Sequence, residues 1–207
     1  MKVAVINYGM GNLNSVRRSF EEIGADVIIA CEPSVLFDAD RVVLPGVGAF
    51  SEGMEHLKVG GWVPVLNDIV KVKKKPLLGI CLGMQVLASK GHEGAETSGL
   101  DFISGEVKKI NSLGCGERIP HMGWNEVHYK MKNLMFEGIP DSSDFYFVHS
   151  YAFVPTNPIN LVATVDYGSE LTAVVQKENI FGCQFHPEKS SKAGRQMLRN
   201  FMSYSLC

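Results

Sequence analysis

Cys81 stands where the sequence pattern changes from that of a strand to that of a helix. Residues 77–80 form a short apolar run typical of a buried strand, and the apolar positions of residues 84–88 recur at helical spacing. Gly79 and Gly83 lie two residues to either side of Cys81, where they allow neighbouring chain to approach closely. The pattern predicts a nucleophile elbow, with the thiolate favoured by the helix N-terminus. A lone cysteine in an apolar strand is more often structural, but the paired glycines favour the catalytic interpretation.

His186 follows the last predicted strand, residues 179–185, and Glu188 comes two residues later, across Pro187. In an open α/β sheet, functional sites assemble at the carboxyl edge of the strands, where Cys81 also lies. A carboxylate that orients an imidazole beside a thiol forms a catalytic triad. A His-x-Glu pattern alone would indicate a surface histidine beside an unrelated acid. Together with the elbow, it predicts a triad of Cys81, His186 and Glu188.

Acyl chemistry at Cys81 also needs donors for an oxyanion. The first expected donor is the backbone N–H of Leu82, directly after the nucleophile. The turn Pro45-Gly46-Val47-Gly48 follows another predicted strand and is placed to supply a second N–H at the same edge. By itself this would be an ordinary glycine-rich turn. Because glycines flank Val47, one peptide can flip, and we expect the turn to have two states.

The elements that must position these residues alternate between short apolar strands and helical patterns, which predicts a parallel sheet covered on both faces. The expected strands are residues 2–7, 26–30, 41–44, 77–80 and 179–185. The expected helices are residues 15–23, the region of His56, 62–71, the segment after Cys81, and 193–204. Strand-like runs between turn clusters predict hairpins inserted on the same sheet at residues 105–110, 125–129, 145–154, 161–166 and 171–176. We expect one α/β domain over residues 1–207, with an open, mostly parallel central sheet and inserted antiparallel hairpins.

The composition of the 207-residue chain is that of a soluble globular protein, with a formal net charge of -2 and 45% hydrophobic residues. The chain has no excess of basic residues, so its composition does not indicate a nucleic-acid partner. No run of apolar residues approaches the ~20 needed for a membrane span. Five irregularly spaced cysteines predict neither disulfides nor a zinc ribbon, which suits a cytoplasmic protein. The six histidines lack metal-ligand spacing, and Gly9-x-Gly11 has Asn14 where a dinucleotide motif needs glycine. We expect neither a metal nor a cofactor.

Two motifs resemble the signatures of the class I, or triad, glutamine amidotransferases: residues 79–85 (GICLGMQ) and 184–188 (QFHPE). Three others, residues 44–50 (LPGVGAF), 121–125 (HMGWN) and 146–151 (YFVHSY), resemble those of glutaminase subunits of imidazole glycerol phosphate synthases. The resemblance implies an enzyme that hydrolyses glutamine and passes ammonia to a barrel synthase (cyclase) subunit in histidine biosynthesis. That subunit would be its obligate heterodimer partner.

Matching motifs assign roles to individual residues. The resemblance implies that Cys81 attacks the side-chain amide carbon of glutamine, that His186 activates the thiol and protonates the departing ammonia, and that Glu188 orients His186. The implied oxyanion hole consists of Val47, Gly48 and Leu82. The implied glutamine-binding residues are Gly48, Gln85, Glu93, His149, Ser150 and Tyr151. The implied face for the synthase consists of Gly9, Asn12, Asn14, His121, Met122, Trp124, Asn125, Tyr146 and Lys189.

Two other interpretations stay open at this point. Residues 86–91 and 143–146 also resemble paralogues that supply ammonia to a surface-sugar amidotransferase, which would keep the catalytic residues and differ in the partner. A non-catalytic regulatory protein on the same fold would have lost part of the triad. We expect the isolated chain to hydrolyse glutamine slowly until a partner closes the oxyanion hole. Trp124 is the candidate interface anchor; the alternative is an ordinary core tryptophan.

Overall fold

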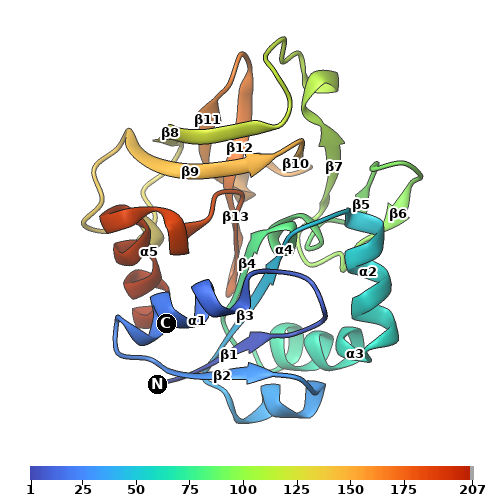
Figure 1. Cartoon of the computed structure of the whole chain (residues 1–207), viewed down its shortest axis with the longest axis vertical. Helices are drawn as coiled ribbons and strands as arrows, with labels where there is room; N and C mark the ends of the chain where they lie inside the picture. Colours follow the sequence, from blue (N-terminus) through green and yellow to red (C-terminus); the bar gives the residue numbers. More distant parts are fainter. Residues whose placement is uncertain (206–207) are drawn as a thin grey trace.

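A nine-stranded sheet forms the centre of the molecule in the computed structural model, which describes residues 1–205 (Figure 1). Its parallel half consists of β2 (Asp26–Ala30), β1 (Lys2–Ile6), β3 (Arg41–Gly46), β4 (Leu77–Cys81) and β13 (Ile180–Cys183), in that order. The antiparallel half continues with β12 (Glu170–Lys177), β11 (Leu161–Asp166), β8 (His121–Tyr129) and β9 (Ser143–His149). The predicted α/β class is confirmed. The sheet is mixed rather than mostly parallel, because the inserted hairpins extend it by a full antiparallel half.

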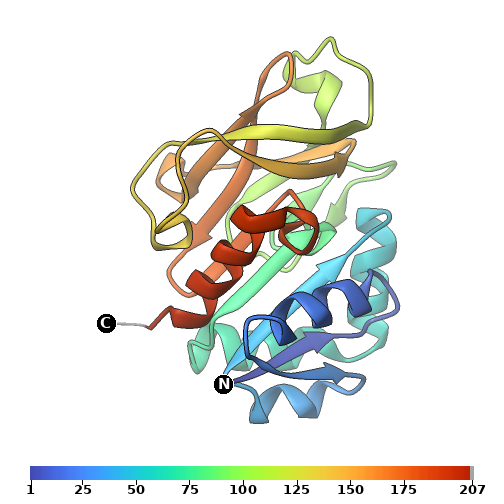
Figure 2. The same cartoon turned by 60° about the vertical axis from the view of Figure 1, so that its left-hand side comes forward.

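Helices cover both faces of the parallel half, as predicted. α1 (Leu13–Glu21) and α5 (Ser191–Ser203) lie on one face, and α2 (Phe50–Val59) and α3 (Trp62–Leu66) lie on the other (Figure 2). The alternation of side chains along a strand divides the core accordingly. In β1, Val3 and Val5 pack with α1 and α5, whereas Ala4 and Ile6 pack with α2 and α3.

A second, four-stranded sheet lies beside the first, with the order β10 (Tyr151–Pro155), β7 (Gly105–Lys109), β5 (Lys90–Gly91) and β6 (Thr97–Ser98). The prediction that residues 145–154 form one strand, and that all hairpins join the central sheet, is wrong. The chain leaves the central sheet at Ser150, whose carbonyl oxygen accepts a hydrogen bond from the N–H of Ile110 at 3.0 Å. β9 therefore pairs with β8, and β10 pairs with β7.

Two predicted helices are shorter than their apolar patterns suggest. α4 (Leu82–Gln85) ends one turn after Cys81, because the carbonyl oxygens of Val86 and Leu87 accept hydrogen bonds from residues 100–103 instead of continuing the helix. α3 ends at Leu66 and continues as a wider π-helical segment, Asn67–Val72. Short 3-10 helices occupy Pro33–Asp38, Ile110–Leu113, Leu134–Phe136, Pro158–Asn160 and Pro187–Lys189. Among the described residues, no helix combines the length and apolarity needed to cross a membrane.

Candidate active site

Three neighbouring parallel strands, β3, β4 and β13, bring the predicted site residues to one edge of the central sheet. The register pairs Gly46 with Cys81 and Ile80 with Cys183, so the three strands end at nearly the same level. Because the carboxyl ends of parallel strands share an edge, the turn after β3, Cys81 itself and the segment after β13 lie side by side. This is the arrangement that the sequence predicts.

Cys81 occupies a sharp turn between β4 and α4, with φ 53° and ψ −110°. Such a backbone conformation is strained for a residue with a side chain and is typical of functional turns. A β-carbon on Gly83 would lie 1.7 Å from the carbonyl oxygen of Leu44, and one on Gly79 would lie 2.6 Å from the carbonyl oxygen of Gly83. Both positions exclude any side chain. The predicted strained turn with close backbone approach is confirmed.

His186 and Glu188 form a buried pair just beyond β13. The Nδ1 atom of His186 lies 2.8 Å from Oε1 of Glu188, and both side chains are almost completely removed from solvent. Burial by itself lowers the pKa of His186, but the nearby Cys81 sulfur and Glu188 carboxylate outweigh it and raise this pKa to about 9. Because Nδ1 is engaged by the carboxylate, the other ring nitrogen is left for the sulfur. The site therefore favours a protonated imidazole beside the Cys81 sulfur.

A cavity of about 320 Å³ opens beside the Cys81 sulfur. The cavity is lined by all six residues to which the resemblance assigns glutamine binding, namely Gly48, Gln85, Glu93, His149, Ser150 and Tyr151. Val47 and Leu82 of the predicted oxyanion hole also line it, together with Pro120 and Val148, which no sequence motif singles out. The volume suits a small amino-acid substrate.

The turn after β3 lines the cavity with Val47 and Gly48. Gly48 has φ 113°, a conformation that favours glycine. Glu93 fixes the far end of this turn, because its Oε2 atom accepts a hydrogen bond of 2.8 Å from the N–H of Phe50 at the start of α2. At the near end, the buried hydroxyl of Tyr8 would lie 2.3 Å from a β-carbon on Gly46. The sequence patterns predict no contact of Tyr8 with this turn, although Tyr8 follows β1 at the same edge.

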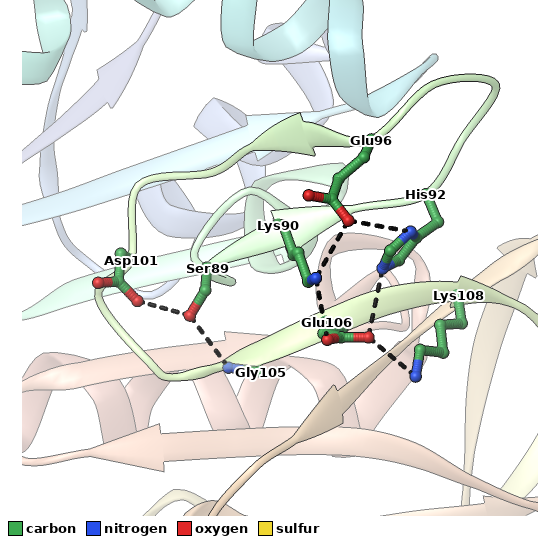
Figure 3. Close-up of polar contacts among 8 residues, drawn as sticks. All are labelled: Ser89, Lys90, His92, Glu96, Asp101, Gly105, Glu106 and Lys108. Atoms are coloured by element: carbon green, nitrogen blue, oxygen red, sulfur yellow. Dashed lines mark hydrogen bonds and ion pairs between the residues drawn. The ribbon is translucent and has the colours of Figure 1, made fainter.

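The segment that carries Glu93 is held to the small sheet by charged side chains (Figure 3). Glu106 in β7 lies 3.4 Å from Lys90, 3.2 Å from His92 and 2.8 Å from Lys108, and Lys90 also contacts Glu96 at 3.0 Å. The hydrogen bonds from Lys108 and Lys90 lower the pKa of Glu106 to about 2. We call these five residues, Lys90, His92, Glu96, Glu106 and Lys108, the surface ion network.

A line of hydrogen bonds runs from β8 toward the cavity. His121 and His149 are register partners in β8 and β9, and their Nδ1 and Nε2 atoms lie 3.0 Å apart. The Nδ1 atom of His149 lies 2.8 Å from the carbonyl oxygen of Tyr151, and Asn125 approaches Nε2 of His121 at 3.5 Å. Because a carbonyl only accepts, His149 donates from Nδ1 and His121 donates to His149. Burial lowers the pKa of His121 to about 4 and that of His149 to about 3, so both rings are neutral at pH 7.

The same Tyr151 carbonyl oxygen connects this line to the nucleophile. Gln85 donates from Nε2 to that oxygen at 3.0 Å and to Oε1 of Gln184 at 3.0 Å. Gln184 in turn donates from Nε2 to the Cys81 sulfur at 3.6 Å. The sequence patterns assign no role to Gln184, although it opens the QFHPE motif. We call the linked residues Asn125, His121, His149, Tyr151, Gln85 and Gln184 the buried polar chain.

Most residues of the predicted synthase face are accessible. Met122 and Trp124 are 61% and 52% exposed, which excludes the core interpretation of Trp124, and Gly9, Asn12, Asn14 and Lys189 are also exposed. Trp124 contacts the edge of Tyr146, and the ammonium group of Lys189 lies 5.8 Å from the centre of the Tyr146 ring. Asn125 and Tyr146 are half-buried. His121 is only 2% exposed, so its side chain lies behind this face rather than on it.

Known proteins with similar sequences belong to one family. The family model for class-I glutamine amidotransferases matches residues 4–204. The chain is 45% identical over 199 residues to the imidazole glycerol phosphate synthase subunit HisH of Moorella thermoacetica, covering 96% of this chain and 93% of that protein. It is 47% identical over 199 residues to subunit HisH 1 of Campylobacter jejuni, covering 96% and 98%.

Solved structures of more distant proteins share the fold. The structure of PurLQS from Thermotoga maritima superposes with a TM-score of 0.76 at 18% identity, covering 98% of both chains. A glutamine amidotransferase from the same organism superposes with a TM-score of 0.65 at 21% identity, covering 98% of this chain and 82% of that one. At these identities the likeness concerns the fold alone.

Proposed function

Because this chain belongs to the class-I glutamine amidotransferase family, we propose that it is the glutaminase subunit of an imidazole glycerol phosphate synthase. In that role it hydrolyses glutamine to glutamate and ammonia for histidine biosynthesis. The observation that carries the proposal is an identity of 41–47% to relatives named as HisH subunits, over nearly the whole chain. The non-catalytic interpretation requires a degraded triad, and here Cys81, His186 and Glu188 are all present: Cys81 lines the cavity, and His186 and Glu188 form a buried pair just beyond β13.

The reaction begins when the Cys81 thiolate attacks the side-chain amide carbon of glutamine. The negative charge moves to the amide oxygen, where the N–H groups of Leu82 and of the turn at Val47 and Gly48 stabilise it. The His186 imidazolium then protonates the nitrogen, the C–N bond breaks, and ammonia leaves a thioester on Cys81. Neutral His186 next takes a proton from water, and the hydroxide attacks the thioester. The C–S bond breaks, glutamate leaves, and the thiolate returns.

Glu188 supports this cycle by holding His186 in one tautomer and stabilising its charged form. The raised pKa of His186 matches the requirement that the resting enzyme carry a proton for the leaving nitrogen. Gln85, Glu93, His149, Ser150 and Tyr151 then bind and orient the rest of the glutamine molecule.

The partner is a barrel synthase subunit that docks on the face formed by Trp124, Met122 and Tyr146. Exposed aromatic and methionine side chains are typical anchors of protein interfaces. Docking there acts directly on β9, because the N–H of His186 donates to the carbonyl oxygen of Tyr146 at 2.9 Å. The oxyanion turn closes only in the complex, so the free subunit does not waste glutamine.

The decisive experiment measures glutamine hydrolysis by the purified chain, first alone and then with the barrel subunit of an imidazole glycerol phosphate synthase and the ribotide ligand of that barrel. We expect slow hydrolysis alone and strong stimulation by the complex. The Cys81→Ala variant should abolish glutamine-dependent synthesis while leaving synthesis from ammonium salts intact. Appreciable hydrolysis by the free chain, without a rise on adding the synthase, would contradict a mechanism in which hydrolysis depends on the partner subunit. Lack of stimulation, with Cys81 still labelled by a glutamine-like affinity reagent, would instead indicate that the chain supplies ammonia to a surface-sugar amidotransferase.

The docking face has its own test. Trp124→Ala should weaken binding of the barrel subunit by about 2 kcal/mol or more, as for a central interface anchor. Ile159→Ala is the matched control, because Ile159 is also a large exposed apolar residue but lies on a 3-10 helix outside the proposed face. Equal affinities of the two variants, measured by titration calorimetry, would place the interface elsewhere.

A further inference from the structure

Gln184 is a fully buried amide between β13 and His186, in direct contact with the Cys81 sulfur. Its backbone is fixed by a hydrogen bond of 2.8 Å from its N–H to the carbonyl oxygen of Ala173 in β12. A buried amide that is only structural is normally satisfied by backbone or other oxygen and nitrogen atoms. Here one of its donors is directed at the nucleophile.

The orientation of the Gln184 amide is determined by its neighbours. Gln85 must present its NH₂ group to the Tyr151 carbonyl oxygen, because a carbonyl accepts and cannot donate. The second hydrogen of the same NH₂ group points to Gln184, which must therefore present its oxygen to Gln85. A flipped Gln184 would place two donors against each other. Its own NH₂ group is consequently held toward the sulfur.

Besides His186, the Cys81 sulfur contacts two polar groups that favour opposite protonation states. The carbonyl oxygen of Val148, at 3.8 Å, accepts a hydrogen bond from the neutral thiol. The NH₂ group of Gln184, at 3.6 Å, donates to sulfur and interacts most strongly with a thiolate. Loss of the proton thus exchanges the Val148 contact for a stronger one with Gln184.

We propose that Gln184 is a further catalytic residue, whose amide N–H stabilises the Cys81 thiolate and is kept in the donating orientation by Gln85. The proposal rests on the proposed glutaminase function and adds a group beyond the triad. It applies at two points of the cycle. Before attack, the donor raises the population of thiolate. When the thioester is hydrolysed, the electron pair of the breaking C–S bond returns to sulfur, and the same donor stabilises that leaving group.

Other titratable groups surround Cys81, either interacting with it, lining the same cavity or bonded to His186, and they are retained when Gln184 is changed. They come from the ends of the three strands β1, β9 and β13 and are Tyr8, His149, Cys183, His186 and Glu188. Any shift in the ionisation of Cys81 on substituting Gln184 therefore reports the lost donor.

The test is the pH dependence of Cys81 alkylation by iodoacetamide in the isolated chain, followed by mass spectrometry of the peptide that carries Cys81. In Gln184→Met, the side chain keeps a similar length but cannot donate. We expect the midpoint of the rate profile to rise by about one to two pH units, the range for losing a hydrogen bond to a charged group. Partner-stimulated kcat should fall, with little change in KM, since Gln184 does not line the cavity.

Gln176→Met is the matched control. Gln176 makes amide hydrogen bonds to Asn133 and to the carbonyl oxygen of Glu178, away from the site, so its loss should leave the midpoint unchanged. A folded Gln184→Met with the wild-type midpoint would overturn the proposal. If Gln184→Met does not fold, Gln85→Met decides: it frees the Gln184 amide to rotate, so a raised midpoint supports the proposal and an unchanged one refutes it.

Alkylation needs neither glutamine nor a partner, which separates this proposal from the proposed function. A shifted midpoint without glutamine turnover would refute the function alone. A wild-type midpoint in Gln184→Met, with normal stimulation of hydrolysis in the unmodified chain, would refute the role of Gln184 alone.

Discussion

Two polar clusters of this protein connect neighbouring strands, one through buried neutral groups and the other through exposed charges. The buried polar chain joins β8, β9, α4 and the segment after β13 through neutral amides, imidazoles and one carbonyl oxygen. The surface ion network joins β5, β7 and the loop between β5 and β6 through full charges (Figure 3). Both lead to the cavity, the first through Gln184 and Cys81 and the second through the neighbourhood of Glu93.

The difference lies in what burial does to each cluster. A buried donor or acceptor cannot exchange its partner for water, so each hydrogen bond of the buried polar chain determines the direction of the next. The exposed charges can exchange partners with water and salt, and their geometry is correspondingly permissive. Of these two clusters, the neutral one therefore fixes the geometry beside the Cys81 sulfur, whereas the exposed charges hold the β5–β6 hairpin near its place.

The largest effect on activity is expected where charge is buried. Glu188→Gln removes the carboxylate that stabilises the His186 imidazolium and keeps a residue of the same shape. We expect partner-stimulated glutamine hydrolysis to fall by about 10²- to 10⁴-fold, the range for losing general acid–base assistance. Synthesis from ammonium salts should not change. A loss smaller than tenfold would mean that the pair at 2.8 Å does not govern the imidazole.

The largest loss of stability is expected at the closely packed turn around Cys81. In Gly83→Ala, the new β-carbon would lie 1.7 Å from the carbonyl oxygen of Leu44, so β3 and α4 must separate. We expect the free energy of unfolding to fall by about 3 kcal/mol or more, as for severe overpacking. Gly116→Ala is the control, because no atom lies within 4 Å of its β-carbon position. Equal unfolding free energies of the two variants in urea would contradict the close approach of β3 and α4.

Acid should weaken the buried polar chain before it affects the surface ion network. His149 has a folded pKa of about 3, below the ordinary value of 6.5, so between these pH values the unfolded chain binds more protons. Stability therefore falls as the pH is lowered from about 6.5, by about 2 kcal/mol at pH 5 from this residue. His121 acts in the same direction.

His149→Gln tests this origin, because it removes the titrating group and should flatten the pH dependence of unfolding between pH 7 and 5. His186 has the opposite sign: its raised pKa contributes stability that is present below pH 6.5 and is lost as the pH rises through about 9. An unchanged acid slope in His149→Gln would assign the acid sensitivity to other groups.

The smallest effect is expected in the surface ion network. Glu106→Gln removes the central carboxylate, but the groups it contacts are hydrated, and exposed ion pairs contribute little. The free energy of unfolding should be almost unchanged, and the small difference should vanish in 1 M salt, where the screening length is about 3 Å. A loss in the free energy of unfolding as large as that of Gly83→Ala would show that exposed charges can contribute as much to stability as buried groups.

Local sequence patterns suffice for many of the elements and for the placement of Cys81, His186 and Glu188 at one edge of the sheet. The strands Asp26–Ala30 and Leu161–Asp166 have the bounds that the sequence predicts, because each is an apolar run that ends at turn residues. The turn at Cys81 is predictable because Gly79 and Gly83 are required by close backbone contacts. Such features depend on neighbours along the chain, which the sequence displays directly.

Features that depend on pairing between distant segments are not predictable in this way. The alternation of residues continues through Ser150, so the pattern indicates one strand; only the partners β8 and β7 divide it between two sheets. The contact of His121 with His149 follows from their register, and the contact of Gln184 with Cys81 follows from the insertion of β13 beside β4. No local periodicity encodes these distances.

The central position of β13 has a consequence for the newly made chain. Cys81 and Gln184 are 103 residues apart, so Cys81 leaves the ribosome roughly 5 to 20 s before Gln184 and His186, at typical elongation rates. During that interval Cys81 has neither of these two buried neighbours. The proposed site is complete only when β13 inserts between β4 and β12 and joins the two halves of the sheet. Translation that stops before β13 therefore yields a chain without the proposed site.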